Sequence, residues 1–155
     1  MGRILAVDYG ERRVGLALSD ENAILVSTTP PTLDRKALPR GQSLEAAIAR
    51  IVEEWEVAEV VLGLPINMDG SQGEAAQKVI AFGAVLKAAL GGVPVNTWDE
   101  RLTSVAAQRV RAELGIPLTK RRDKGKVDSL AAVILLQNYL AWKRGGGGPA
   151  EADPD

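Results

Sequence analysis

The chain contains no cysteine and no histidine. Without cysteine it can form no disulfide framework and has no thiolate nucleophile, which fits a reducing compartment. Without histidine it can form no serine–histidine or cysteine–histidine pair, no histidine-ligated zinc site and no imidazole general base. Any hydrolytic chemistry must therefore depend on carboxylates, lysine, backbone dipoles or a metal ion that is held by oxygen atoms.

Long hydrophobic runs are also missing. No apolar stretch is long enough to span a bilayer, and the N-terminus lacks the basic and apolar regions of a signal peptide. We therefore expect a cytoplasmic protein that has no membrane partner. The 155 residues suit one domain with a sizeable core. The last stretch, GGGGPAEADPD, predicts a flexible acidic tail over residues 145–155, after a single domain over residues 1–144.

Hydrophobic patterning predicts an α/β fold. A continuous apolar run at Arg3–Asp8 is followed, after short turns, by extended segments at Val14–Ser19 and Ala23–Thr29, which predicts a meander of three antiparallel strands. Helical spacing then alternates with two more buried strands. The remaining elements are expected to be a helix capped by Ser43, a strand at Glu59–Leu64, a helix opened by a Ser71–Glu74 capping box, a strand at Val93–Trp98 with Pro94 at a sheet edge, a helix from Thr103 or Ser104 to Gly115, and a helix at Lys126–Trp142.

Carboxylates follow two of these strands. Strands joined through helical crossovers lie parallel in one sheet, and sites gather at their carboxyl ends. Asp8 ends the first strand, and Asp99 with Glu100 ends the last one. Asp128 shares one helix face with apolar residues, so it is expected to point toward the sheet. A cation would offset the cost of such a cluster, and oxygen ligands alone favour Mg²⁺ or Mn²⁺ over zinc.

Four motifs occur in a diagnostic order: DYGERRVGLALSD, VVLGLPINMDGS, WDERLTS and KGKVDSLAAVILLQNYL. Together they resemble the YqgF/RuvX family of bacterial Holliday junction resolvases and pre-16S rRNA nucleases, from the first residues to about Trp142. The resemblance implies a ribonuclease H-like fold with a mixed five-stranded sheet in the order 3-2-1-4-5, flanked by helices. It also implies a metal-dependent endonuclease that acts on structured nucleic acid. Cleavage of DNA junctions would in addition imply a homodimer.

The same resemblance implies that Asp8, the acid of the WDER motif and Asp128 are catalytic and hold the metal. Many relatives in the wider superfamily carry an acid at the end of the fourth strand, where this chain reads LGLP. The missing acid would therefore come from the next strand, about 10 Å away across the sheet. Glutamate is longer than aspartate, so we predict Glu100 in this role, with Asp99 as the second candidate. Side-chain alternation places the two on opposite faces, which predicts that one of them is structural.

A basic segment, TKRRDKGK, is expected to contact the nucleic-acid backbone. Arg12 and Arg101 are further candidates, although each is equally well explained as a solvated surface charge. The predicted phosphate-binding residues are Arg12, Arg101, Arg121, Arg122, Lys124 and Lys126.

Two other readings of the sequence remain open. The D-x-G pattern that is followed by Gly15 also resembles the first phosphate motif of actin-like proteins and sugar kinases, which would make this chain a phosphate-binding domain. The second alternative is a non-catalytic module that binds nucleic acid. P-loop and GxGxxG signatures are absent from the sequence.

Overall fold

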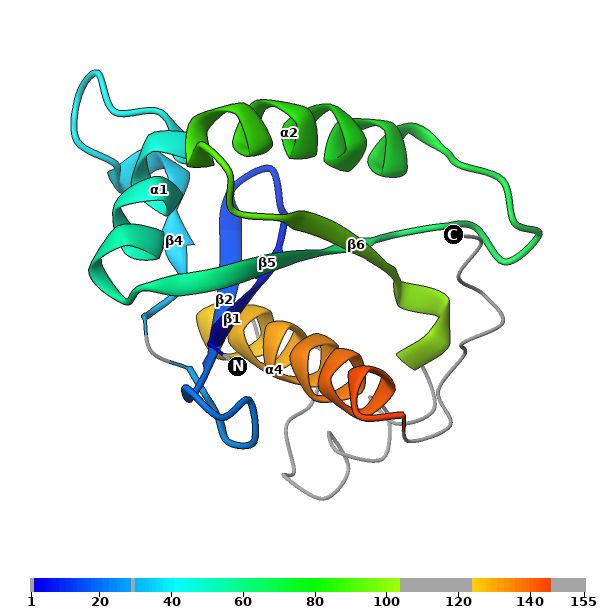
Figure 1. The fold of residues 1–155 in the computed structure, drawn as a ribbon. Helices are drawn as coiled ribbons and strands as arrows, with labels where there is room; N and C mark the ends of the chain where they lie inside the picture. Colours follow the sequence, from blue (N-terminus) through cyan, green and yellow to red (C-terminus); the bar gives the residue numbers. More distant parts are fainter. Residues whose placement is uncertain (1, 29, 104–123, 146–155) are drawn as a thin grey trace.

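The computed structural model describes residues 2–28, 30–103 and 124–145, without the side chains at positions 102, 103 and 124–128. In the described part, a sheet is covered by α1 and α2 on one face and by α4 on the other (Figure 1). Most of the helix expected from Thr103 or Ser104 to Gly115 falls outside the described residues, as does the predicted tail after Gly145. None of the described helices combines the length and hydropathy that crossing a membrane requires.

The sheet is mixed. Strand β1 runs antiparallel to β2 and parallel to β5, and β5 runs parallel to β6. The spatial order β3-β2-β1-β5-β6 confirms the predicted fold class and the predicted order of five strands. The elements are β1 Arg3–Asp8, β2 Arg13–Ser19, β3 Val26–Ser27, β4 Leu33–Asp34, the 3-10 helix η1 Arg35–Ala37, α1 Leu44–Glu54, β5 Val57–Leu64, α2 Glu74–Leu90, β6 Val95–Asp99, the 3-10 helix η2 Glu100–Thr103 and α4 Lys124–Lys143.

The meander differs from its prediction in two details. The third strand is only two residues long, because the Asp20 carboxylate accepts hydrogen bonds from the amides of Ile24 and Leu25 and so holds the preceding residues in a turn. After the proline pair, the chain returns to β2 and forms a sixth strand, β4. The expected count of five strands was therefore one too low, because a two-residue strand leaves almost no periodic signal.

The helix starts were predicted with mixed success. Ser43 caps α1, and its hydroxyl accepts a hydrogen bond from the amide of Ala46 at 3.2 Å, as expected. The Ser71–Glu74 capping box was wrong. Gly73 is the N-cap of α2 and makes no side-chain hydrogen bond, whereas the Ser71 hydroxyl donates to Asp69 within the preceding loop. A local Asp–x–Ser turn thus competes successfully for the serine.

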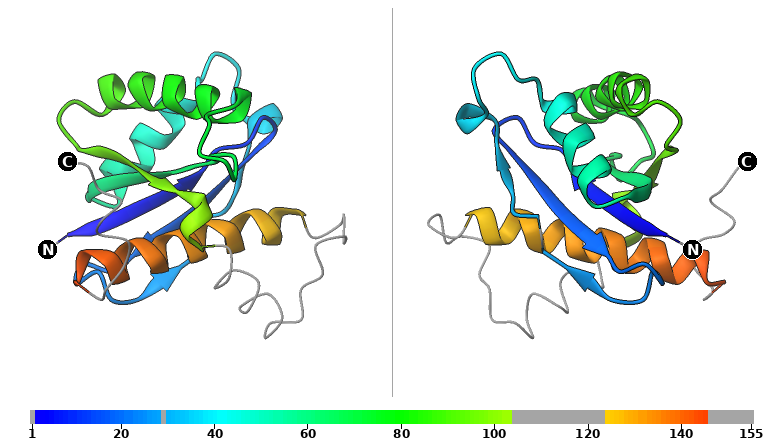
Figure 2. Two further views of the ribbon diagram at one scale, coloured as in Figure 1. Left: turned by 90° about the vertical axis from the view of Figure 1, so that its right-hand side faces the viewer. Right: turned by 60° about the vertical axis from the view of Figure 1, so that its left-hand side comes forward.

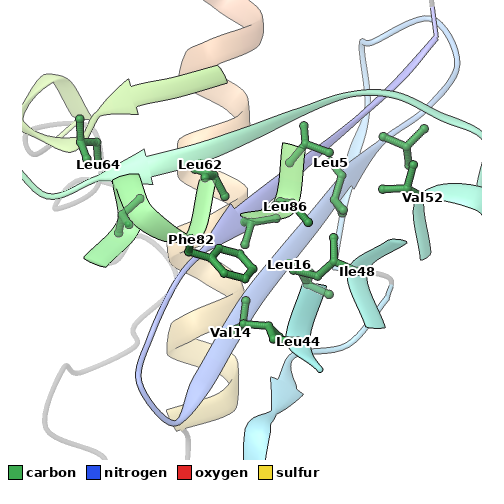
Figure 3. Packing of buried hydrophobic residues seen from close by; sticks show 14 of the residues in the cluster. Leu5, Val14, Leu16, Leu44, Ile48, Val52, Leu62, Leu64, Phe82 and Leu86 are labelled. Carbon is green, nitrogen blue, oxygen red and sulfur yellow. The ribbon is translucent and has the colours of Figure 1, made fainter. Parts of the chain in front are cut away.

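Side-chain alternation along the strands produces two cores. Leu5 and Val7 of β1 face α1 and α2, in the cluster that Figure 3 shows with Leu62 and Phe82. Ile4 and Ala6 belong to the second cluster, which packs against α4. The two further views in Figure 2 show the same layering, with α4 alone beneath the sheet in the described part of the chain. Both faces of β1 are therefore buried, as its continuous apolar run predicts.

Ser19 should contribute strongly to stability. It is 2% exposed, and its hydroxyl accepts a hydrogen bond from the Ile4 amide at 2.8 Å while donating to the Asp20 carbonyl at 3.1 Å. Ser19→Ala leaves the Ile4 amide unsatisfied in the core, so we expect the free energy of unfolding to fall by about 1–3 kcal/mol. Urea unfolding measures this change. An unaltered midpoint would mean that the amide finds another partner in the variant.

Candidate active site

Asp8 is the last residue of β1 and lies where three neighbouring strands end. It pairs with Gly15 of β2 in the antiparallel ladder. On the other side, Val7 pairs with Leu62 of β5, so the next position places Asp8 beside Gly63. Ile4 and Ala6 face α4, and alternation therefore places Asp8 on that same face. The partly buried carboxylate thus stands at the rim of the sheet, on the α4 side.

Glu100 reaches this carboxylate from β6, although β5 lies between. It follows the last residue of β6 and opens η2, which leads from the strand end toward α4 (Figures 1 and 2). Its side chain lies over Gly63 and forms a hydrogen bond with the side chain of Asp8. The structure therefore brings together two of the three acids that the sequence pointed to.

The environment of this pair disfavours a second negative charge. Burial raises the pKa of Glu100, and the nearby Asp99 carboxylate raises it further, while the hydrogen bond with Asp8 acts in the opposite direction. Without a cation, burial and the neighbouring Asp99 carboxylate therefore make ionisation of Glu100 beside Asp8 unfavourable.

Asp99 has a different partner. Its Oδ2 accepts hydrogen bonds from Nε and Nη2 of the Arg101 guanidinium at 3.0 and 2.7 Å, and its Oδ1 accepts from the same Nε at 3.2 Å and from the Arg101 amide at 2.9 Å. Burial raises the pKa of Asp99, but these bonds outweigh it and hold the pKa below its usual value. Asp99 therefore forms an ion pair with Arg101, whereas Glu100 contacts Asp8.

Arg35 fixes the turn that follows Asp8. Its Nη1 donates to the carbonyls of Gly10 at 3.0 Å and Glu11 at 3.3 Å, and its guanidinium stacks 5.1 Å from the centre of the Tyr9 ring. From the other side of the turn, Lys78 of α2 forms an ion pair with Glu11. Contacts from two separate elements therefore hold the chain immediately after the candidate site.

The remaining candidates differ in how far the structure describes them. Arg12 forms an ion pair with Asp34 at 3.3 Å, and Arg101 is bound to Asp99 as above. Position 128 is the fifth residue of α4 and lies just beyond its first turn, next to Ser129, whose hydroxyl is 2.7 Å from that of Thr32. The side chains of Asp128, Lys124 and Lys126 lie outside the described part of the chain, as do residues Arg121 and Arg122 entirely.

Sequence reasoning missed the contribution of Gly63. The segment LGLP indicated only that an acid is absent from the end of the strand. Its glycine, Gly63, is also a signal, because a glycine inside a buried strand indicates that another group approaches closely. Sequence reasoning also missed Arg35, which no motif singles out and which contacts the turn only through the fold.

The donor set fits a hard divalent cation. The residues that meet at the rim are two carboxylates, and the chain has no histidine or cysteine to add a nitrogen or sulfur ligand. Among the side chains that the structure describes, no group of three potential ligands is gathered. A third carboxylate would have to come from outside that set.

Comparisons with known proteins identify the family of the chain. The sequence matches the RuvX family, described as Holliday junction resolvase, over residues 2–142. Proteins named "Putative pre-16S rRNA nuclease" from Syntrophus aciditrophicus and Chloroflexus aurantiacus are 42% and 43% identical to this chain. The first alignment covers 89% of this chain and 87% of the relative, and the second covers 91% and 88%.

The solved structures support the fold. Thermus thermophilus RuvC in complex with a Holliday junction substrate superimposes with a TM-score of 0.55 at 22% identity, over 95% of this chain and 99% of that one. A second structure of the same protein gives a TM-score of 0.54 at 20% identity. At this level of identity the likeness extends to the ribonuclease H-like architecture alone.

Proposed function

This chain belongs to the RuvX family, and from that membership we propose that it is a metal-dependent endonuclease that hydrolyses phosphodiester bonds in structured nucleic acid. The observation that carries the proposal is the Asp8–Glu100 carboxyl pair at the carboxyl ends of the parallel strands. Family membership favours this reading over a phosphate-binding domain or a non-catalytic binding module.

We assign the cation to Asp8, Glu100 and Asp128. The raised pKa of Glu100 supports the assignment, because a divalent cation held by these acids would compensate the negative charge that burial and Asp99 disfavour. When bound, Mg²⁺ or Mn²⁺ polarises the phosphodiester and lowers the pKa of water. Asp99 is the weaker candidate for a ligand, since Arg101 donates hydrogen bonds to both of its oxygens.

The other residues bind and orient the substrate. The basic segment that contains Arg121, Arg122, Lys124 and Lys126 would hold the phosphate backbone, because its charge stands next to the helix turn that carries Asp128. The turn after Asp8, which Arg35 and Lys78 hold, keeps the Asp8 carboxylate in place. A fixed carboxylate saves the reaction the cost of orienting it in each turnover.

We further propose precursor 16S rRNA as the substrate, with processing at its 5′ end. The choice of precursor 16S rRNA rests on the names of relatives that share about two fifths of their residues with this chain over most of both lengths, and the 5′ end is what the family resemblance implies. Junction DNA is the competing substrate, and its symmetrical cleavage would call for a homodimer.

Cleavage is expected to require a divalent cation. With Mg²⁺ or Mn²⁺, end-labelled precursor rRNA should be cut, excess EDTA should abolish the cutting, and restored cation should return it. A four-way DNA junction assayed in parallel identifies the preferred substrate. Undiminished cleavage by metal-stripped protein in EDTA would contradict the mechanism, and faster cutting of the junction would reassign the substrate.

A further inference from the structure

Gly63 stands at an unusual place for a glycine. It lies in the buried strand β5, one residue before the strand ends, and pairs with Trp98 of β6. On its other side is Asp8 of β1, one step beyond the Val7–Leu62 pair. Glycine inside a strand weakens it, because it offers no side chain to pack and loses more backbone entropy on folding. A glycine between a tryptophan and a carboxylate therefore requires an explanation.

The space above Gly63 is filled by Glu100. A Cβ atom added to Gly63 would overlap Oε2 of Glu100 and would stand 3.1 Å from its Cδ and 3.3 Å from its Cγ. A Cβ contact as short as the one with Oε2 essentially never occurs, so a side chain at position 63 would require Glu100 or the backbone to shift. The side chain of Glu100 thus crosses β5 directly over the backbone of Gly63.

We infer that Gly63 is a positioning residue of the active site, because its missing side chain leaves the passage through which Glu100 reaches Asp8 across β5. Glu100 starts at the end of β6, two strands away from β1, and meets Asp8 on the far side of Gly63. An acid at the end of β5 would lie beside Asp8 without having to cross a strand. In this chain, Glu100 takes the place of such an acid, and Gly63 lets it cross β5. The catalytic part of this inference rests on the proposed nuclease function, and the packing part does not.

Thermal melts in EDTA test the packing. Gly63→Ala should lower the melting temperature of the otherwise unchanged chain, because the new methyl overlaps Glu100 and either that side chain loses its contact with Asp8 or the β5 backbone shifts. In a Glu100→Ala background the same methyl group enters vacated space, so the loss should disappear or change sign. A matched control is Gly83→Ala in α2, whose new methyl would meet Leu62 of the same strand from the opposite face, 3.1 Å from Cδ1. Its effect should be the same in both backgrounds. Equal shifts for Gly63→Ala in the two backgrounds would overturn the inference.

Kinetics test the catalytic part. With Mg²⁺ and a substrate that the wild type cleaves, Gly63→Ala should reduce kcat by about 100-fold, since a misplacement of roughly 1 Å has this effect on a reacting group. KM should change by less than about threefold, because the variant leaves the phosphate-binding residues intact. Gly83→Ala should retain wild-type kcat. Retained activity in Gly63→Ala would overturn the positioning role. If the wild type cleaves none of the nucleic acids, the proposed function fails, and the melts alone still decide whether Gly63 forms the passage.

Discussion

Glu100→Gln is expected to abolish cleavage and, at the same time, to raise the melting temperature of the metal-free protein. Activity should fall by more than the roughly 10²–10³-fold that removal of a single hydrogen-bond donor costs an enzyme. The gain in stability follows from the burial of Glu100 and its proximity to Asp99, which both penalise its charged form. The neutral amide keeps the size of the side chain and can still donate to Asp8. Functional sites commonly show this opposition between stability and activity.

The gain in melting temperature of Glu100→Gln should depend on pH in a defined direction. The pKa of Glu100 is raised in the folded protein, so the folded state binds more protons than the unfolded state above the ordinary value of 4.5. The contribution of Glu100 to the stability of the wild type is fully present below pH 4.5 and is lost as the pH rises through the raised pKa. The advantage of Glu100→Gln should therefore be absent in acid and grow toward neutral pH. Melts over a pH series, in EDTA, measure it.

Asp99→Asn is the matched control, since it makes the same chemical change at the adjacent residue. The pKa of Asp99 lies below its ordinary value because of Arg101, so its contribution to stability is present at neutral pH and is lost in acid. This variant should melt lower than the wild type at neutral pH.

Added Mg²⁺ should stabilise the wild type but not Glu100→Gln, because a ligand of the native state raises its apparent stability. If both variants melt lower in EDTA and Mg²⁺ shifts all three proteins equally, the Glu100 carboxylate is architectural.

Replacing four basic residues should change the salt dependence of binding more than any other property. Substitution of Arg121, Arg122, Lys124 and Lys126 by alanine removes up to four phosphate contacts, each worth about 0.9 in the slope of log K against log salt on a duplex. If all four engage, the wild type should lose about 100-fold more affinity than the variant between 50 and 200 mM salt. Fluorescence anisotropy with a labelled duplex over that range measures both slopes.

A charge control separates local contacts from net charge. Arg50 of α1 and Lys87 of α2 are exposed on the helices that cover the opposite face of the sheet from α4. Their joint replacement by alanine should leave the slope unchanged. Turnover at saturating substrate should change less than affinity in the four-residue variant. Identical slopes for the wild type and that variant would mean that the basic segment does not touch the substrate.

The sequence predicts most of the fold because its signals are local and repeated. The continuous apolar run of β1, the helical spacing after Ser43 and the crossovers between strands predict the layers and the parallel neighbours, while the full strand order was implied by the family resemblance. The predicted cap of α2 and the predicted length of β3 were wrong because, in each case, one polar side chain makes a local hydrogen bond that the pattern does not reveal. Ser71 bonds within its loop instead of capping α2, and Asp20 shortens β3 by holding a turn.

The candidate site was predictable only in its parts. Asp8 and the Asp99–Glu100 pair follow from strand ends, but alternation alone does not tell which acid turns toward Asp8. That choice depends on two contacts: Arg101 binds Asp99, which no pattern encodes, and Gly63 leaves room for Glu100, which the strand glycine signalled but our sequence analysis missed. Asp128 remains a prediction, because its side chain lies outside the described part of the chain.

The crossing of Glu100 over β5 also bears on when the protein becomes active. The β1–β2 hairpin closes a short loop and can form early, yet it carries only Asp8. The second acid arrives only after two long crossovers have placed β5 beside β1 and β6 beside β5, and parallel pairing over such separations is slow because loop closure must come first. A nascent or partly folded chain is therefore expected to be catalytically inactive. The topology of the sheet would in this way delay nuclease activity until folding is complete.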